Sequence, residues 1–244
     1  MKRFLVGIAL VGLLASTAQA QLAVFPTWYN STGSGVGIFA MFGMGLNSDA
    51  QYADDASNPA AFGGMVTVNA GVFKAWGGAN YVDPKVTGLD KEVTFGGNLG
   101  VGLYKQQSAS PVYVDLMVGV GYAKFGDAVT GQITQMQFPI AIPIAVALEV
   151  SEGYTLAPWF APGLQIFNTK FSDAAGDTSE TNLGFGVAGG LNFQSTMGLS
   201  LFVVGDWSTA TIGGVKNKPF RIGAGIGYSF NVSSFGESKG LFGN

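Results

Sequence analysis

Hydrophobic and polar side chains alternate strictly along residues 219–230, PFRIGAGIGYSF. The even positions from Phe220 to Phe230 are apolar or aromatic, and the odd positions from Arg221 to Ser229 are polar or glycine. A period of two over a full strand length predicts a β-strand with one apolar and one polar face. Aromatic residues at both ends of the apolar face, with glycines opposite, are typical of strands in a membrane β-barrel.

The same alternation recurs along the chain and predicts nine further strands. In most of them Val, Ile, Leu and Phe occupy one face, and Gly, Asn, Thr or Gln occupy the other. The third expected strand has no clear phase because Gly77 and Gly78 interrupt it, and the seventh is ambiguous around Trp159. The nine expected strands cover residues 35–46, 63–71, 74–82, 92–104, 111–124, 134–149, 154–169, 181–193 and 198–208.

Four prolines fall within the sixth and seventh expected strands: Pro139, Pro143, Pro158 and Pro162. Proline has no backbone N–H to donate to a ladder, so prolines inside sheets gather at edges and bulges. We therefore expect the two prolines of the sixth strand to mark bulges.

The connections between the expected strands differ in length in a regular way. Those after the first, third, fifth, seventh and ninth strands are mostly long and polar, including 47–62, 125–131 and 170–180, whereas the others are short. Outer-membrane barrels have long loops outside and short turns toward the periplasm, with an even number of strands. The sequence predicts an all-β, closed antiparallel transmembrane β-barrel of about ten strands, or of eight if 74–82 or 154–169 is not a full strand.

The first 20 residues have the organisation of a secretory signal peptide. Lys2 and Arg3 precede an apolar core, and the sequence Ala18-Gln19-Ala20 offers a cleavage site. Beyond this leader the longest apolar stretch is 138–148, which is too short to span a bilayer as a helix and contains two prolines. Only helices and closed barrels satisfy the backbone in lipid, so an exported apolar chain of this kind is expected in the outer membrane.

The composition excludes several classes of chemistry. The sequence has 12 Lys and Arg against 15 Asp and Glu, and loss of Lys2 and Arg3 with the leader takes the formal net charge from −3 to −5. An acidic chain without a basic block argues against nucleic acid as a partner. There is no Cys and no His, which removes disulfides, thiolate chemistry and the commonest general base and metal ligand.

The chain resembles the small bacterial outer-membrane β-barrels of the OmpA/OmpX-like superfamily over most of residues 35–230. The specific part of the resemblance is the final strand, where Gly225, Tyr228 and Phe230 look like the C-terminal signal that the barrel-assembly machinery recognises. Residues 231–244 continue past the terminal aromatic, and Gly223 stands where the signal usually has a polar residue. The sequence as a whole predicts four segments: signal peptide 1–20, periplasmic lead-in or plug 21–34, barrel 35–230 and tail 231–244.

Few residues are candidates for a site. Arg221 and Asp206 face inward near the outer ends of neighbouring strands, so we predict a lumenal ion pair between them, with separate solvation as the alternative. Asp49, Asp54 and Asp55 do not match a calcium-binding loop, and a solvated loop is the favoured interpretation. The glycines around Gly225 lie in a strand rather than before a helix, which argues against a nucleotide-binding loop.

No cofactor or metal site is predicted. The families of barrel proteases, lipases and acyltransferases that the chain resembles in architecture use an active-site His, so we predict a protein that is not an enzyme. The first hypothesis is a structural or surface-exposed barrel in the outer membrane, with a narrow small-solute pore as one form of it. The alternatives are a barrel whose surface loops bind a ligand or a host surface, an enzyme, and a soluble periplasmic lipid carrier. The expected partners are outer-membrane lipid, lipopolysaccharide and the barrel-assembly machinery.

Overall fold

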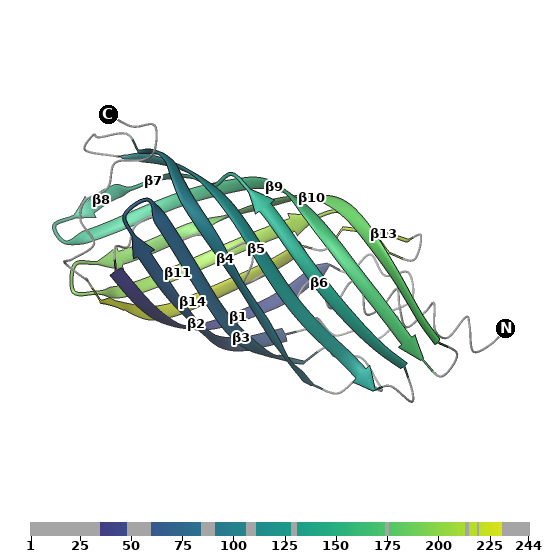
Figure 1. The fold of residues 1–244 in the computed structure, drawn as a ribbon. Helices are drawn as coiled ribbons and strands as arrows, with labels where there is room; N and C mark the ends of the chain where they lie inside the picture. Colours follow the sequence, from purple (N-terminus) through teal and green to yellow (C-terminus); the bar gives the residue numbers. More distant parts are fainter. Residues whose placement is uncertain are drawn as a thin grey trace.

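The structure is a computed structural model that describes residues 35–47, 60–83, 91–105, 111–127, 131–173, 176–212, 215–218 and 220–230. The predicted signal peptide 1–20, the lead-in 21–34, the tail 231–244 and the aspartates at 49, 54 and 55 lie outside the described residues. Figure 1 shows tilted strands that wrap around a common axis. Among the described residues no helix is long and apolar enough to cross a bilayer.

Antiparallel strands make up the described part of the chain. Their bounds are β1 (Gly35–Asn47), β2 (Ala60–Ala70), β3 (Phe73–Asp83), β4 (Glu92–Lys105), β5 (Val112–Asp127), β6 (Gly131–Ala141), β7 (Ile144–Val146), β8 (Leu148–Ser151), β9 (Tyr154–Asp173), β10 (Gly176–Ser195), β11 (Leu199–Ser208), β12 (Ala210–Ile212), β13 (Val215–Asn217) and β14 (Phe220–Phe230).

The sheet closes on itself because β1 pairs with both β2 and β14. Phe39 lies opposite Met65 on one side and opposite Gly227 on the other. Every other strand of the ring pairs with its neighbours along the chain, and β6, β7 and β8 together occupy one place between β5 and β9. The predicted closed barrel of ten antiparallel strands is therefore confirmed, and β12 and β13 form a separate small hairpin.

The prediction of bulges at the prolines of the sixth expected strand is wrong. Val118 pairs with Ile140 and Val114 pairs with Ile144, so both strands advance by four residues between these pairs and no residue is inserted. The strand is interrupted only in its hydrogen bonding, which separates β6, β7 and β8. A proline lacks the N–H but keeps its carbonyl, and the Pro143 carbonyl accepts a bond from the β5 backbone.

Two predicted loops are largely strand. Residues 125–131 and 170–180 were expected to be loops, but β5 and β6 reach Asp127 and Gly131, and β9 and β10 reach Asp173 and Gly176. The outward side chains at the ends of these strands are mostly polar or glycine, although Phe125 and Ile133 are buried inside, so the sequence has no apolar outer face there while the backbone ladder continues. Asn168 donates a hydrogen bond to Thr181, 2.9 Å away, and Lys170 forms an ion pair with Asp177 at 2.6 Å.

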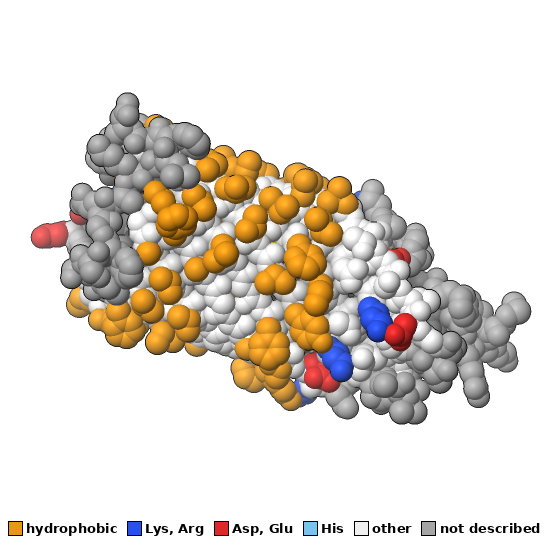
Figure 2. Space-filling model, in the orientation of Figure 1, with side chains coloured by type: hydrophobic (Ala, Val, Ile, Leu, Met, Phe, Trp, Pro, Cys, Tyr) orange, Lys and Arg blue, Asp and Glu red, His pale blue; other side chains and the backbone are white. Residues whose placement is uncertain are grey.

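The outside of the barrel carries a broad apolar band. In Figure 2 hydrophobic side chains spread over the middle of the visible face, and charged side chains gather beyond them at one end. The band is formed by residues that the alternation predicted to face outward, among them Ile38, Phe42, Val66, Phe95, Leu99, Val118, Ile140, Phe185, Leu201 and Ile226. The structure also fixes the two uncertain phases, because Trp76 of β3 and Trp159 of β9 are buried in the interior.

Candidate functional site: the barrel lumen

The interior of the barrel holds a polar level near each end and an apolar level between them. We call the end where β1 begins and β14 ends the short-turn end, because the turns at 71–72, 152–153 and 196–198 lie there. We call the opposite end, reached by the β9–β10 hairpin, the hairpin end. The apolar level is the apolar belt, which consists of Phe39, Met41, Met65, Trp76, Met117, Trp159, Phe202 and Val204.

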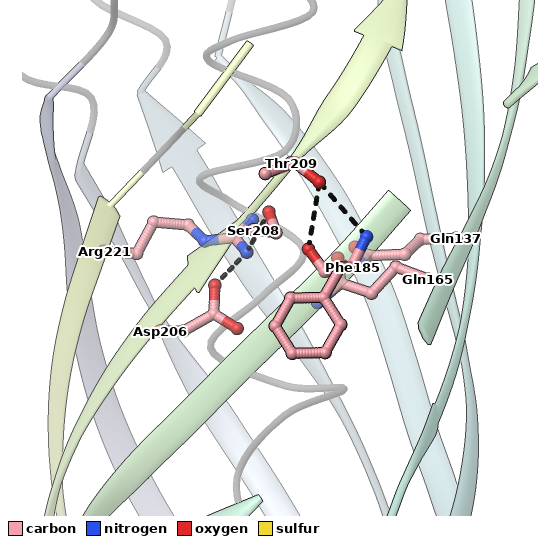
Figure 3. A network of polar contacts seen from close by, with 7 residues as sticks. All are labelled: Gln137, Gln165, Phe185, Asp206, Ser208, Thr209 and Arg221. Atoms are coloured by element: carbon pink, nitrogen blue, oxygen red, sulfur yellow. Dashed lines mark hydrogen bonds and ion pairs between the residues drawn. The ribbon is translucent and has the colours of Figure 1, made fainter. Parts of the chain in front are cut away.

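The polar level toward the hairpin end contains the ion pair between Arg221 and Asp206. The two residues lie directly opposite each other on β14 and β11, and their side chains form a salt bridge. Arg221 also donates a hydrogen bond from its guanidinium to the Ser208 hydroxyl at 3.1 Å. Figure 3 shows these three side chains meeting inside the wall. Arg221 is 1% exposed and Asp206 is 3% exposed, so both charges are withdrawn from solvent.

A second polar contact lies in this level, on the far side of the neighbouring strand β10. Gln137 of β6 donates a hydrogen bond from its amide to the Gln165 carbonyl oxygen of β9 at 2.7 Å, and both side chains are buried. Between the two polar contacts, Thr209 bonds to the Phe185 backbone through its N–H at 2.7 Å and through its hydroxyl (Figure 3). Thr209 thus holds the end of β11 against β10 at the position where their ladder stops.

The apolar belt fills the lumen because large side chains lie over glycines of neighbouring strands. A Cβ added at Gly225 would lie 2.3 Å from the Phe202 ring, and one at Gly227 would lie 2.5 Å from the Phe39 ring. The two phenylalanine rings are 5.9 Å apart between centroids. The glycine-rich faces of the strands therefore leave room that these rings occupy. The inward glycines are the spaces into which the aromatic rings fit.

The polar level toward the short-turn end contains a second ion pair, between half-buried Lys74 of β3 and buried Asp115 of β5. The two strands are not neighbours, since β4 lies between them. Gly100 and Gly102 of β4 have no side chains to separate the pair, and added Cβ atoms there would lie 3.5 Å from Lys74 and from Asp115. This pair was not predicted from the sequence, because the alternation in β3 did not show which of its side chains face inward. The alternating glycines of β4 beside inward-facing Asp115 were the available signal.

Three further residues of the final strand lie as the alternation predicts. Tyr228 and Phe230 are exposed on the outer surface, with ring centroids 5.0 Å apart, whereas Gly225 faces inward. Among the described residues no group of three or more Asp, Glu, Cys or His could hold a metal ion. The charged groups of the lumen occur mainly as neutralised pairs. Such an arrangement shapes an interior, and the described part of the chain shows no recognisable set of nucleophile, base and oxyanion donors.

The comparisons with known proteins give weak structural similarities. No protein-family model matches the sequence, and a sequence search of curated proteins finds no match. The N-terminal β-barrel domain of Pseudomonas aeruginosa OprF is 13% identical with a TM-score of 0.32, covering 81% of this chain and all of that domain. The Escherichia coli outer-membrane protease OmpT is 12% identical with a TM-score of 0.42, covering 84% of this chain and 100% of its own.

A third similar structure is the transport unit of the E. coli autotransporter AIDA-I. It is 13% identical with a TM-score of 0.48, covering 90% of this chain and 98% of that one. At these identities and TM-scores the similarities carry no argument about family or activity. The function therefore has to be argued from the barrel itself.

Proposed function

We propose that this chain is an integral outer-membrane β-barrel with a structural or surface role, and that its lumen is closed to ions and solutes. The observation that supports this proposal is the apolar belt, which joins Phe39, Trp76, Met117, Trp159 and Phe202 across the interior. A hydrophobic constriction excludes water and blocks permeation even where it is not sterically sealed. The apolar band on the outer face supports insertion in a bilayer, because a soluble barrel would leave that surface in water.

Planar-bilayer conductance tests the closed lumen. We expect the refolded wild-type barrel to insert without a steady conductance, and the double variant Trp76→Ala/Trp159→Ala to conduct, because it removes two large rings from the belt. Leu99→Ala is the matched control, since it removes a large side chain from the outer face. A steady conductance of the wild type would contradict the closed lumen, and conductance of the control equal to that of the double variant would contradict the role of the belt.

Membrane fractionation tests the location. We expect the protein in the outer-membrane fraction, with heat-modifiable gel mobility as the sign of a folded barrel. Recovery of the folded protein in the periplasmic fraction would contradict the location and favour the soluble carrier.

A second candidate function is binding at the surface, and one observation favours it. The β9–β10 hairpin continues to Asp173 and Gly176, and its polar end includes the exposed pair Lys170 and Asp177. β10 pairs with β11 only from Gly186 to Gln194, so among the described strands its residues 176–185 form a ladder with β9 alone. Shortening this hairpin should abolish surface binding without changing membrane insertion, and binding that survives the deletion would exclude this candidate.

The absence of catalysis and the role of the final strand also belong to this proposal. Gly225, Tyr228 and Phe230 would present the signal for the barrel-assembly machinery, with the two aromatic rings exposed on one side of β14. Phe230→Ala should lower the yield of assembled barrel in cells and leave refolding of the purified protein intact. Equal yields of wild type and variant in cells would contradict this role. Protease and lipase assays on the refolded protein should show no activity.

A further inference from the structure

Two lysines, one tyrosine and one aspartate meet at the short-turn end of the lumen. The Lys74 and Lys105 ammonium groups each lie 5.6 Å from the centroid of the Tyr113 ring. Asp115 pairs with Lys74 and is buried, whereas Lys74, Lys105 and Tyr113 are partly open to solvent. The cluster therefore combines two positive charges, one negative charge and one phenol at the mouth.

A β-bulge brings Lys105 to this cluster. In the ladder between β4 and β5, Gly102 lies opposite Asp115 and Tyr104 lies opposite Val114, so one extra residue is inserted in β4. Without the bulge, Lys105 would share the outer face with Leu99. With it, Tyr104 becomes the exposed residue and Lys105 lies opposite Tyr113. Bulges at the rim of a barrel commonly redirect one side chain, and here the redirected side chain is a second cation.

The charge of this cluster is not balanced among its four side chains. Asp115 neutralises Lys74, and among the described residues Lys105 forms no ion pair. Glu149 and Glu152 also lie at this end, on β8 and in the turn after it, but the four side chains of the cluster alone carry an excess positive charge and a phenol that can donate a hydrogen bond, which is the chemistry that binds an oxyanion.

We propose that Lys105, Lys74 and Tyr113 form a binding site for a phosphate group at this mouth. Lys105 would supply the principal charge, and Lys74 would contribute while it remains paired with Asp115. The site faces the periplasm if the barrel lies in the outer membrane with its short turns inward, and this statement alone rests on the proposed function. The phosphate could be a free ion or the headgroup of a lipid, and the two sources are separated by the choice of probe.

The test is a binding titration of the refolded barrel in dodecyl maltoside micelles, a detergent without phosphate, followed by phosphorus NMR. The probes are inorganic phosphate and, separately, the soluble short-chain lipid dihexanoyl phosphatidylglycerol. We expect saturable binding of at least one probe, weakened about tenfold in Lys105→Gln and retained in Lys105→Arg. Lys124→Gln is the matched control, because Lys124 is exposed on the outer face of β5, and it should bind as the wild type does.

Each result has a defined meaning. Binding of phosphate alone identifies a free solute, and binding of the lipid alone identifies a headgroup. Absence of binding by both probes, in protein whose heat-modifiable mobility shows a folded barrel, overturns the site and leaves the proposed function intact. Equal affinity of wild type and Lys105→Gln also overturns it. Tyr113→Phe should weaken binding less than Lys105→Gln does, since it removes one hydrogen bond and no charge.

Discussion

Removal of the Asp206 carboxylate is the most informative single perturbation of the lumen. Asp206→Ala leaves the Arg221 guanidinium buried at 1% exposure and keeps its hydrogen bond to the Ser208 hydroxyl at 3.1 Å. A buried charge without its counter-ion is far less stable than one in water, since the lost hydration is no longer compensated. The substitution should therefore destabilise the folded barrel even though it removes only a few atoms.

The expected magnitude follows from the burial of both partners. Breaking a fully buried ion pair by removing one partner costs about 3–5 kcal/mol. The hydrogen bond from Arg221 to Ser208 is retained, so we expect the lower end, ~3 kcal/mol, or about two orders of magnitude in the unfolding equilibrium. Asp206→Leu/Arg221→Met replaces both charges by apolar groups and should lie within ~1 kcal/mol of the wild type.

The assay is urea-induced unfolding of the barrel in lipid vesicles, followed by tryptophan fluorescence and by heat-modifiable mobility. Asp177→Ala is the control, because it breaks the exposed ion pair with Lys170 on the hairpin and should produce no measurable change. A stability of Asp206→Ala within ~0.5 kcal/mol of the wild type would refute a structural role for the pair. A double variant as unstable as the single variant would refute the uncompensated charge as the cause.

Two further predictions concern packing and the hairpin. Gly225→Val places side-chain atoms against the Phe202 ring and should destabilise the refolded barrel by ~1–3 kcal/mol. The double variant that also carries Phe202→Ala should recover stability. Unchanged stability of Gly225→Val in urea unfolding would contradict the fit of the ring over the glycine. A hydrogen bond from Lys170, and a second from Ser172, hold the pKa of Asp177 below its ordinary value. The contribution of this contact to the stability of the fold is therefore complete above the ordinary pKa of an aspartate. It is lost as pH falls through the lowered pKa of Asp177. A carbon NMR titration should show the lowered midpoint, which Lys170→Gln raises; an unchanged midpoint would contradict the contact.

The ring of strands could be predicted from the sequence because one face of most strands is apolar. Ile38, Phe95 and Leu99 belong to this exposed face, which would contact acyl chains in the proposed membrane location, so the period of two is clear throughout the band. The same reasoning fails above the membrane. There both faces of β9 and β10 contact water, no apolar period exists, and strand residues resemble a loop.

The interior could be predicted only where one hairpin brings two residues together. Asp206 and Arg221 lie near the facing ends of strands joined by a single connection, so their neighbourhood followed from the antiparallel order. The contact between Lys74 and Asp115 depends on the register of three strands and on the missing side chains of β4. The bulge that redirects Lys105 has no sequence pattern of its own, because the position of an inserted residue is set by the tertiary packing.

The central claim is that the apolar face of the strands contacts lipid and the glycine-rich face encloses the lumen. The chain has no cysteine, so single cysteines can be introduced and spin-labelled one at a time along β4, including the adjacent positions Asn98 and Leu99. In barrels reconstituted in vesicles, oxygen should relax the label strongly at Leu99, which is 62% exposed, and weakly at buried Asn98, with the same alternation at Phe95 and Gly96. Equal oxygen accessibility at the two faces, or stronger relaxation of the Leu99 label by a water-soluble nickel complex than by oxygen, would contradict the account.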